Sequence, residues 1–304
     1  MSDRIAEFGA GERTSAERGA VGPGGAGRGG TGRGSARLPR LVATDLDGTL
    51  VGRDDRVSER TAEVLSRMSA AGTAIVLVTG RPVRWMPTVY AHLPAPYLSV
   101  CANGGVIYDP ASDRVRDSWA IPPALLSELC LRMRAAVPGV VFAVEVDDGR
   151  AMRYEPAWPV RWDVGLPTSE SAPLAELTER PAVKLLARAP GVGSDEFVAL
   201  IESIVDGEVV PTHSSRSGLV EMSARGVTKA TGLATVAAEL GVDAADVLAF
   251  GDMPNDVPML KWAGRSVAVS NAHPAARAAA GDITLSNEDD GVAAYLERLL
   301  EPAP

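Results

Sequence analysis

The chain of 304 residues is long enough for two domains of ordinary size, and its 46% hydrophobic and 23% charged residues are typical of a globular protein. It contains no apolar run of about 18 residues, which argues against a membrane span, and its N-terminus lacks the apolar core of a signal peptide. Its two cysteines cannot form a disulfide framework, so we expect a cytoplasmic protein in which Cys101 and Cys130 are buried.

The net charge of −9 is distributed unevenly along the chain. Residues 1–40 carry seven arginines against four acidic residues, a balance of +3, so the remaining residues carry −12. An acidic body argues against nucleic acid as the main partner. Residues 1–37 are rich in Gly, Arg and Ser and have no apolar periodicity, so we expect a disordered tail there. The pattern does not indicate an oligomeric state.

The residues after the tail alternate between strand and helix patterns. Buried strands are expected at 41–44, 73–79 and 97–102, with a helix capped by Ser58 after the first and a helix over 83–92 after the second. Continuous apolar runs of this kind are typical of parallel strands that are covered on both faces. The pattern therefore predicts a Rossmann-like parallel α/β sheet.

The pattern changes after about Ser118. Its middle part predicts a helix over 122–136, a hairpin of 140–146 with 152–154, a strand at 183–187, a helix over 194–205 and a strand at 208–212. This mixture indicates an α+β unit, here called the cap, inserted into the α/β domain. Trp158 and Trp162 of this unit could form a platform for a planar ring, although packing explains them as well.

The α/β pattern resumes from Leu219. It predicts a helix over 228–240, a strand at 246–250, a short strand at 267–269 and a last helix over 291–300. The expected domain limits are 1–37 for the tail, 38–114 with 216–304 for the catalytic core, and 115–215 for the cap.

Asp45 and Asp47 follow the first strand and precede Gly48. Side chains two apart on a strand point the same way, so both carboxylates would face one spot beyond its carboxyl end. A solvated Asp-Gly turn is the simplest alternative. An EF-hand calcium loop is excluded, because Arg56 stands where that loop needs a glutamate.

More polar residues occupy the ends of later strands, where parallel α/β sheets bind their ligands. They are Thr79, Asn103, Asp252 and Asp256. Carboxylate oxygens with few histidines suit Mg²⁺ better than Zn²⁺. A carboxylate near Mg²⁺ can attack a phosphoryl group, while a second carboxylate moves the proton. The hydroxyl of Thr79 can hold phosphoryl oxygens, and Lys229, at the start of a helix, can stabilise the nucleophile and the phosphate.

Several segments in this order resemble the haloacid dehalogenase superfamily of phosphatases, and within it the Cof-type members with a large inserted cap. The resemblance covers about residues 39–300 and rests on the motifs at 45–50, 79–82, 103–105, 226–229, 251–256, 267–272 and 287–292. Ser270 departs from the pattern, because many relatives have glycine before Asn-Ala. The resemblance implies a hydrolase acting on small-molecule phosphate esters, such as a sugar phosphate or a phosphorylated cofactor.

The resemblance also implies roles for individual residues. Asp45 would be the nucleophile and Asp47 the general acid and base. Mg²⁺ would be held by the Asp45 side chain, the Asp47 carbonyl and Asp252, with Asp256 orienting metal-bound water. The remaining roles are phosphate binding by Thr79, Gly80, Lys229 and Asn255, and a substrate entrance at Asn103 and Gly104. The cap would close over the substrate and exclude water.

Two alternatives remain open. Relatives with a similar cap act as sugar phosphomutases, which return the phosphoryl group to a sugar. The second alternative is a non-catalytic phosphometabolite-binding protein, which would keep the same fold. Loss of a catalytic position would favour this alternative, and none is lost here.

Overall fold

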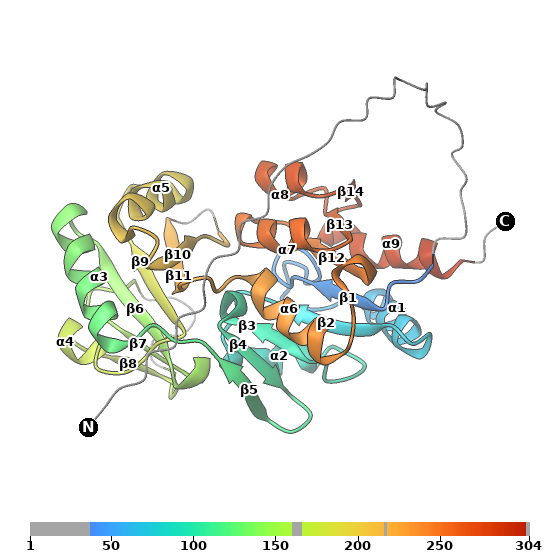
Figure 1. Ribbon diagram of the computed structural model, residues 1–304, viewed down its shortest axis with the longest axis horizontal. Helices are drawn as coiled ribbons and strands as arrows, with labels where there is room; N and C mark the ends of the chain where they lie inside the picture. The colour runs from blue at the N-terminus through green and yellow to red at the C-terminus, as the bar shows by residue number, and fades with distance from the viewer. Residues whose placement is uncertain (1–36, 160–165, 216–217, 302–304) are drawn as a thin grey trace, which may run out of the picture. The chain divides into compact units, whose positions relative to one another are not determined.

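The computed structural model describes residues 37–159, 166–215 and 218–301. The tail expected for 1–37, except Arg37, and Trp162 lie outside these residues, so both expectations stay predictions. Within the described ranges the strands form two sheets, one of eight strands and one of six (Figure 1).

The eight-stranded sheet has the order β14-β13-β12-β1-β2-β3-β4-β5. Its strands are β1 (Leu41–Thr44), β2 (Ala74–Val78), β3 (Ser99–Cys101), β4 (Val106–Asp109), β5 (Arg114–Ser118), β12 (Val247–Gly251), β13 (Arg265–Ala268) and β14 (Asp282–Ile283). From β14 to β3 all neighbours are parallel, and β4 and β5 continue the sheet antiparallel. The predicted Rossmann-like parallel core is confirmed.

Helices cover both faces of this sheet, because alternate residues of a buried strand point to opposite sides. The helices of this part are α1 (Glu59–Ala70), α2 (Met86–Tyr90), α6 (Lys229–Glu239), α7 (Val257–Trp262), α8 (Pro274–Ala279) and α9 (Gly291–Leu300). Val42 packs on the side of α1 and α9, and Leu41 and Ala43 pack on the side of α6 and α7. The predicted cap of α1 is confirmed, since Ser58 Oγ accepts a hydrogen bond from the Thr61 amide at 3.0 Å.

The six-stranded sheet has the order β10-β11-β9-β6-β7-β8. Its elements are α3 (Pro123–Ala136), β6 (Val141–Val146), β7 (Ala151–Tyr154), β8 (Ser169–Ser171), α4 (Leu174–Leu177), β9 (Lys184–Arg188), α5 (Ser194–Val205), β10 (Val209–Thr212) and β11 (Leu219–Ala224). Phe142 and Leu185 of one face pack against α3 and α5. The opposite face carries a smaller apolar cluster that includes Met152, Trp158 and Leu186.

One strand belongs to a different sheet from the one that the sequence pattern indicates. The strand β11 pairs with β9 and β10 in the six-stranded sheet. The α/β pattern therefore resumes at α6 and not at Leu219. The reason is that an apolar strand such as β11 has the same local sequence pattern in either sheet, and only its pairing partners decide its place. The domain limits 38–114, 115–215 and 216–304 stay a prediction.

A tight loop after β3 brings Asn103 against the start of α6. Ala102, Asn103 and Gly104 all have positive φ, at 51°, 58° and 101°. A Cβ added to Gly104 would lie 2.0 Å from the carbonyl oxygen of Thr228 and 3.3 Å from the amide nitrogen of Lys229. Only glycine permits this close approach of two backbones.

We expect Gly104→Ala to lower the free energy of unfolding by about 2–4 kcal/mol, from backbone strain and overpacking together. Gly72→Ala is the matched control, because Gly72 also has positive φ but a Cβ there would meet no atom within 4 Å. The control should lose only about 1 kcal/mol. Chemical denaturation measures both, and equal losses would contradict the close approach.

Across the described residues, the structure contains no helix that is long and apolar enough to cross a bilayer.

Candidate active site

The carboxyl edge of the eight-stranded sheet gathers polar side chains from adjacent strands. Strand β1 lies between β12 and β2, so Asp45 after β1, Thr79 after β2 and Asp252 after β12 end at the same edge. The chain leaves β1 toward β2 on one side and returns through β12 on the other, which makes this edge a topological switch point, where such sheets bind ligands.

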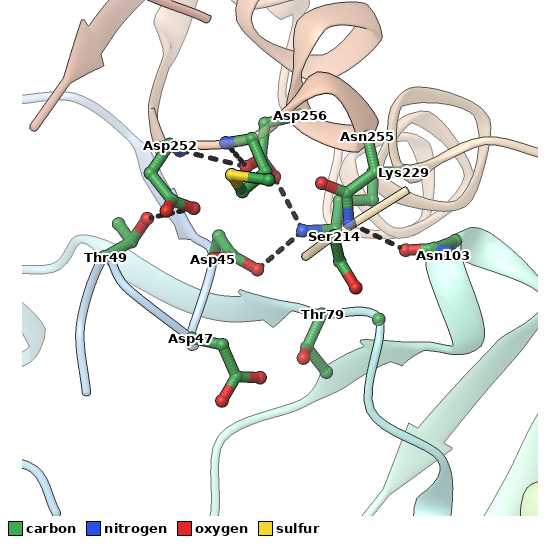
Figure 2. A network of polar contacts seen from close by, with 12 residues as sticks. Asp45, Asp47, Thr49, Thr79, Asn103, Ser214, Lys229, Asp252, Asn255 and Asp256 are labelled. Carbon is green, nitrogen blue, oxygen red and sulfur yellow. Dashed lines mark hydrogen bonds and ion pairs between the residues drawn. The ribbon is translucent and has the colours of Figure 1, made fainter. Parts of the chain in front are cut away.

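Lys229 stands at the centre of this group (Figure 2). Its Nζ donates to Asp45 Oδ1 at 2.5 Å and to Asp256 Oδ1 at 2.6 Å, and its side chain is only 1% exposed. As the first residue of α6 it lies at a helix N-terminus, where a cation is unfavourable unless anions are near. The two carboxylates supply that compensation.

Asp256 and Asp252 are tied to each other and to the loop after β1. The second oxygen of Asp256, Oδ2, accepts from the amides of Asp252 and Met253, each at 2.9 Å. Oδ1 of Asp252 accepts from the hydroxyl of Thr49 at 3.2 Å. A Cβ on Gly48, whose φ is +79°, would lie 2.5 Å from Asp252 Oδ2, so the backbone passes directly beside this carboxylate.

The site concentrates negative charge in a buried place. Burial, and then the charges of Asp256 and Asp47, raise the pKa of Asp45 to about 7, although Lys229 opposes the shift. Burial, with the charges of Asp45 and Asp256, raises the pKa of Asp252 to about 9. Burial alone would lower the pKa of Lys229, but Asp256 and Asp45 outweigh it and raise that pKa above its ordinary value. The lysine therefore stays charged.

The donor set fits a hard divalent cation. One carboxylate oxygen from each of Asp45, Asp252 and Asp256 lies within 4.8 Å of the others. Three carboxylates against a single ammonium leave a surplus of negative charge, and burial makes that surplus costly without a cation or bound protons. Oxygen donors without histidine or cysteine suit Mg²⁺.

The raised pKa values predict how a divalent cation bound at this cluster would act on stability. A carboxyl group with a raised pKa in the folded chain contributes stability below its ordinary pKa of 3.8 and loses it as the pH rises through the folded value, here about 7 for Asp45 and about 9 for Asp252. A cation that replaces these protons restores the loss. We therefore expect the rise in Tm on adding Mg²⁺ to be larger at pH 8.5 than at pH 6. The affinity for Mg²⁺ should be at least about tenfold higher at pH 8.5 than at pH 6. Thermal unfolding and calorimetric titration measure both, and an effect independent of pH would contradict the assigned ligands.

The residues expected to bind phosphate and to line the entrance lie beside this cluster. Thr79 is fully buried, and its hydroxyl accepts from the amide of Arg81 at 3.0 Å. Nδ2 of Asn255 donates to Oδ1 of Asn103 at 3.0 Å, and a Cβ on Gly80 would lie 3.1 Å from the same Asn103 oxygen. The structure thus brings Asp45, Lys229 and these residues to one place. Because Gly104 has no side chain, the loop that carries Asn103 can lie directly against the backbone at the start of α6.

Asp47 occupies a different position from the other carboxylates. Its side chain is 55% exposed and pairs with Arg81, whose Nη2 lies 2.5 Å from Oδ1 and whose Nε lies 2.9 Å from Oδ2. Among the described residues its carboxylate is not part of the acidic cluster. A contribution of Asp47 to metal binding through its main-chain carbonyl stays a prediction.

A cavity of about 750 Å³ opens from these residues to the open face of the six-stranded sheet. Its walls include Asp45, Asp47, Asp252 and Asn255 on one side and Met152, Trp158, Leu186, Lys184 and Glu221 on the other. Sequence reasoning assigned no role to Lys184 or Glu221. The available signal was a charged residue inside an apolar strand, and Lys184 is also one of only three lysines in the chain.

Fold and site together define an α/β enzyme with an acidic centre that can hold a cation and a phosphate. The family model for haloacid dehalogenase-like hydrolases matches residues 42–296. The chain belongs to this family.

Similar proteins span nearly the whole described chain. A Bacillus subtilis protein named as 5-amino-6-(5-phospho-D-ribitylamino)uracil phosphatase YitU is 28% identical over 274 residues, which cover 85% of this chain and 97% of that protein. An HMP-PP phosphatase of Yersinia pseudotuberculosis is 28% identical over 275 residues, covering 86% and 95%. The crystal structure of SMU.1108c from Streptococcus mutans has the same fold, with a TM-score of 0.77 at 21% identity, covering 86% and 99%.

Proposed function

We propose that this chain is a Mg²⁺-dependent phosphatase that hydrolyses a small phosphate monoester through an aspartyl phosphate on Asp45. The observation that carries the proposal is the position of Lys229, whose Nζ lies between Asp45 and Asp256 at 2.5 and 2.6 Å. A buried ammonium beside the nucleophile stabilises negative charge as a phosphoryl group arrives. The phosphatases among its relatives support the same reaction.

The side chains act in two steps. An oxygen of Asp45 attacks phosphorus, the bond from phosphorus to the ester oxygen breaks, and Asp47 gives a proton to the leaving oxygen. In the second step Asp47 takes a proton from water as that water attacks phosphorus, and the bond to Asp45 breaks to release inorganic phosphate. Lys229 and the hydroxyl of Thr79 hold the phosphoryl oxygens throughout. When bound by Asp45 and Asp252, Mg²⁺ would neutralise phosphate charge and help to orient the phosphate.

The cavity favours a substrate with an organic part of moderate size. A volume of about 750 Å³ lies within the usual range for small-molecule sites. Met152, Trp158 and Leu186 give the six-stranded sheet an apolar wall, against which a ring can pack. The relative named for a phosphorylated ribitylaminouracil supports a phosphorylated cofactor or its precursor, alongside sugar phosphates.

A panel of phosphate esters with and without Mg²⁺ tests this function. We expect release of inorganic phosphate from some esters in Mg²⁺ and none after chelation. Release from no ester would contradict the proposal, and conversion of a hexose 1-phosphate to the 6-phosphate would indicate a phosphomutase.

Two unbridged, buried cysteines, Cys101 and Cys130, favour a reducing compartment, and we propose the cytoplasm.

A further inference from the structure

Two buried charged residues of the six-stranded sheet contact the loops of the acidic site. Lys184 on β9 and Glu221 on β11 are each 3% exposed, and Lys184 Nζ lies 2.6 Å from Glu221 Oε2. The same Nζ donates to the carbonyl oxygen of Gly80 at 2.5 Å. Gly80 directly follows Thr79, so this lysine holds the turn at which a phosphate would bind.

Glu221 continues the chain of contacts into the site. Its Oε2 accepts from Asn103 Nδ2 at 2.9 Å, and Asn103 Oδ1 accepts from Asn255 Nδ2 at 3.0 Å (Figure 2 shows the second contact). A carboxylate can only accept, so Asn103 must turn its NH₂ group to Glu221 and its oxygen to Asn255. Asn255 must then turn its NH₂ group to Asn103. The orientation of both amides is therefore dictated by Glu221 and not by the site itself.

The series of hydrogen bonds that starts at Glu221 ends at the side-chain oxygen of Asn255, an acceptor that needs a donor. Oδ1 of Asn255 is buried and has no hydrogen-bond partner within the described residues. Asn255 also lines the cavity beside Asp45 and Asp252. Buried acceptors are almost always satisfied, so a donor such as a bound water or the hydroxyl of a protonated phosphate is required at this point.

Glu221 is kept in its accepting form. Burial by itself would raise its pKa, but the Lys184 ammonium, with hydrogen bonds from Ser214 and Asn103, outweighs burial and lowers that pKa. Both members of the pair are buried and each has further partners, so the arrangement resembles the satisfied polar networks that fix one geometry.

We propose that Glu221, charge-balanced by Lys184, is a positioning residue of the active site that acts through Asn103 to hold the Asn255 amide in one orientation beside the reacting phosphate. This inference rests on the proposed phosphatase function. It gives the six-stranded sheet a part in the reaction itself, because the Asn255 amide is oriented only while β9 and β11 are seated against the loops after β2 and β3.

A double-mutant cycle in Asn103 and Glu221 tests this hydrogen-bond relay, which runs from Glu221 through Asn103 to Asn255. Acetyl phosphate is the substrate, because its organic part is a single acetyl group, which offers little surface for contact with the apolar wall of the six-stranded sheet. We expect Asn103→Ala and Glu221→Met each to lower kcat about tenfold or more with little change in KM, and the double variant to lose no more than either one. Glu221→Gln keeps an acceptor and should retain most of the activity. Additive losses, or wild-type kcat in Glu221→Met, would overturn the relay.

Two further measurements keep the test decisive. The pair Lys184→Met with Glu221→Met removes both charges, so it folds without an unpaired buried ion. Its kcat should be no higher than that of Glu221→Met, and recovery of the wild-type kcat would overturn the relay. Glu170→Met is the matched control. Glu170 of the same sheet is an exposed partner of Arg153, so this variant should leave kcat unchanged.

If wild type releases no phosphate from any ester, the proposed function fails. The same double-mutant cycle, measured as the Kd for inorganic phosphate, then still decides the relay. Non-additive weakening supports it and additive weakening overturns it.

Discussion

Asp45→Asn is expected to lower kcat by about 10⁴-fold or more without destabilising the fold. A carboxamide has no anionic oxygen with which to attack phosphorus, so the covalent route is lost. The same change removes one of three crowded carboxylates, and burial together with the charges of neighbouring carboxylates raises the pKa values of Asp45 and Asp252. The free energy of unfolding of the metal-free protein should therefore stay the same or rise.

The combination of lost activity and retained stability separates chemistry from folding. Phosphate release under saturating substrate gives kcat, and chemical denaturation without metal gives the free energy of unfolding. Asp54→Asn is the matched control, because Asp54 is an exposed aspartate on the loop after Asp45, and its carboxylate accepts a hydrogen bond from the backbone amide of Arg56. Activity of Asp45→Asn within tenfold of wild type would contradict the assignment of the nucleophile.

Lys229→Met is expected to damage both activity and stability. The variant loses the ammonium that lies within 2.6 Å of two carboxylates, so kcat should fall by about 10²–10³-fold or more. It also leaves Asp45 and Asp256 buried without their cation, which costs about 3–5 kcal/mol when one partner of a buried pair is removed. Mg²⁺ should restore part of the stability, because it supplies positive charge to the same carboxylates, and little of the activity.

Lys261→Met is the control for this variant. Lys261 lies on α7 and is exposed, so its removal should change the free energy of unfolding by less than about 0.5 kcal/mol. Denaturation with and without Mg²⁺, and kcat for the same ester, test both variants. Equal stability of Lys229→Met and wild type in the absence of metal would contradict the buried ion-pair network.

The strands that carry the acidic site could be predicted because each is a short, continuous apolar run with a polar residue directly after it. Buried parallel strands require that pattern, and their carboxyl ends meet at one edge. Thus the sequence alone is enough to place Asp45, Thr79, Asn103 and Asp252 together. The resemblance then supplied the roles, which local pattern alone left open between a turn and a catalytic site.

Other features depend on tertiary pairing and have no local signal. The strand β8 is a polar edge strand of three residues, Ser169–Ser171, and such a strand looks like a loop in sequence. The strand β11 has an apolar pattern that suits either sheet. Lys184 and Glu221 lie far apart in sequence, and their pairing follows from β9 and β11 being neighbours in the sheet.

The most direct test of the central claim is to identify the residue that carries the phosphoryl group during turnover. A reaction with Mg²⁺ and a good phosphate ester is quenched in acid within the first turnover, digested, and analysed by peptide mass spectrometry. The account predicts the added mass of one phosphoryl group on Asp45 in the wild type, and no labelled peptide in Asp45→Asn. A phosphoryl group on another residue, or none while phosphate is released at the normal rate, would contradict it.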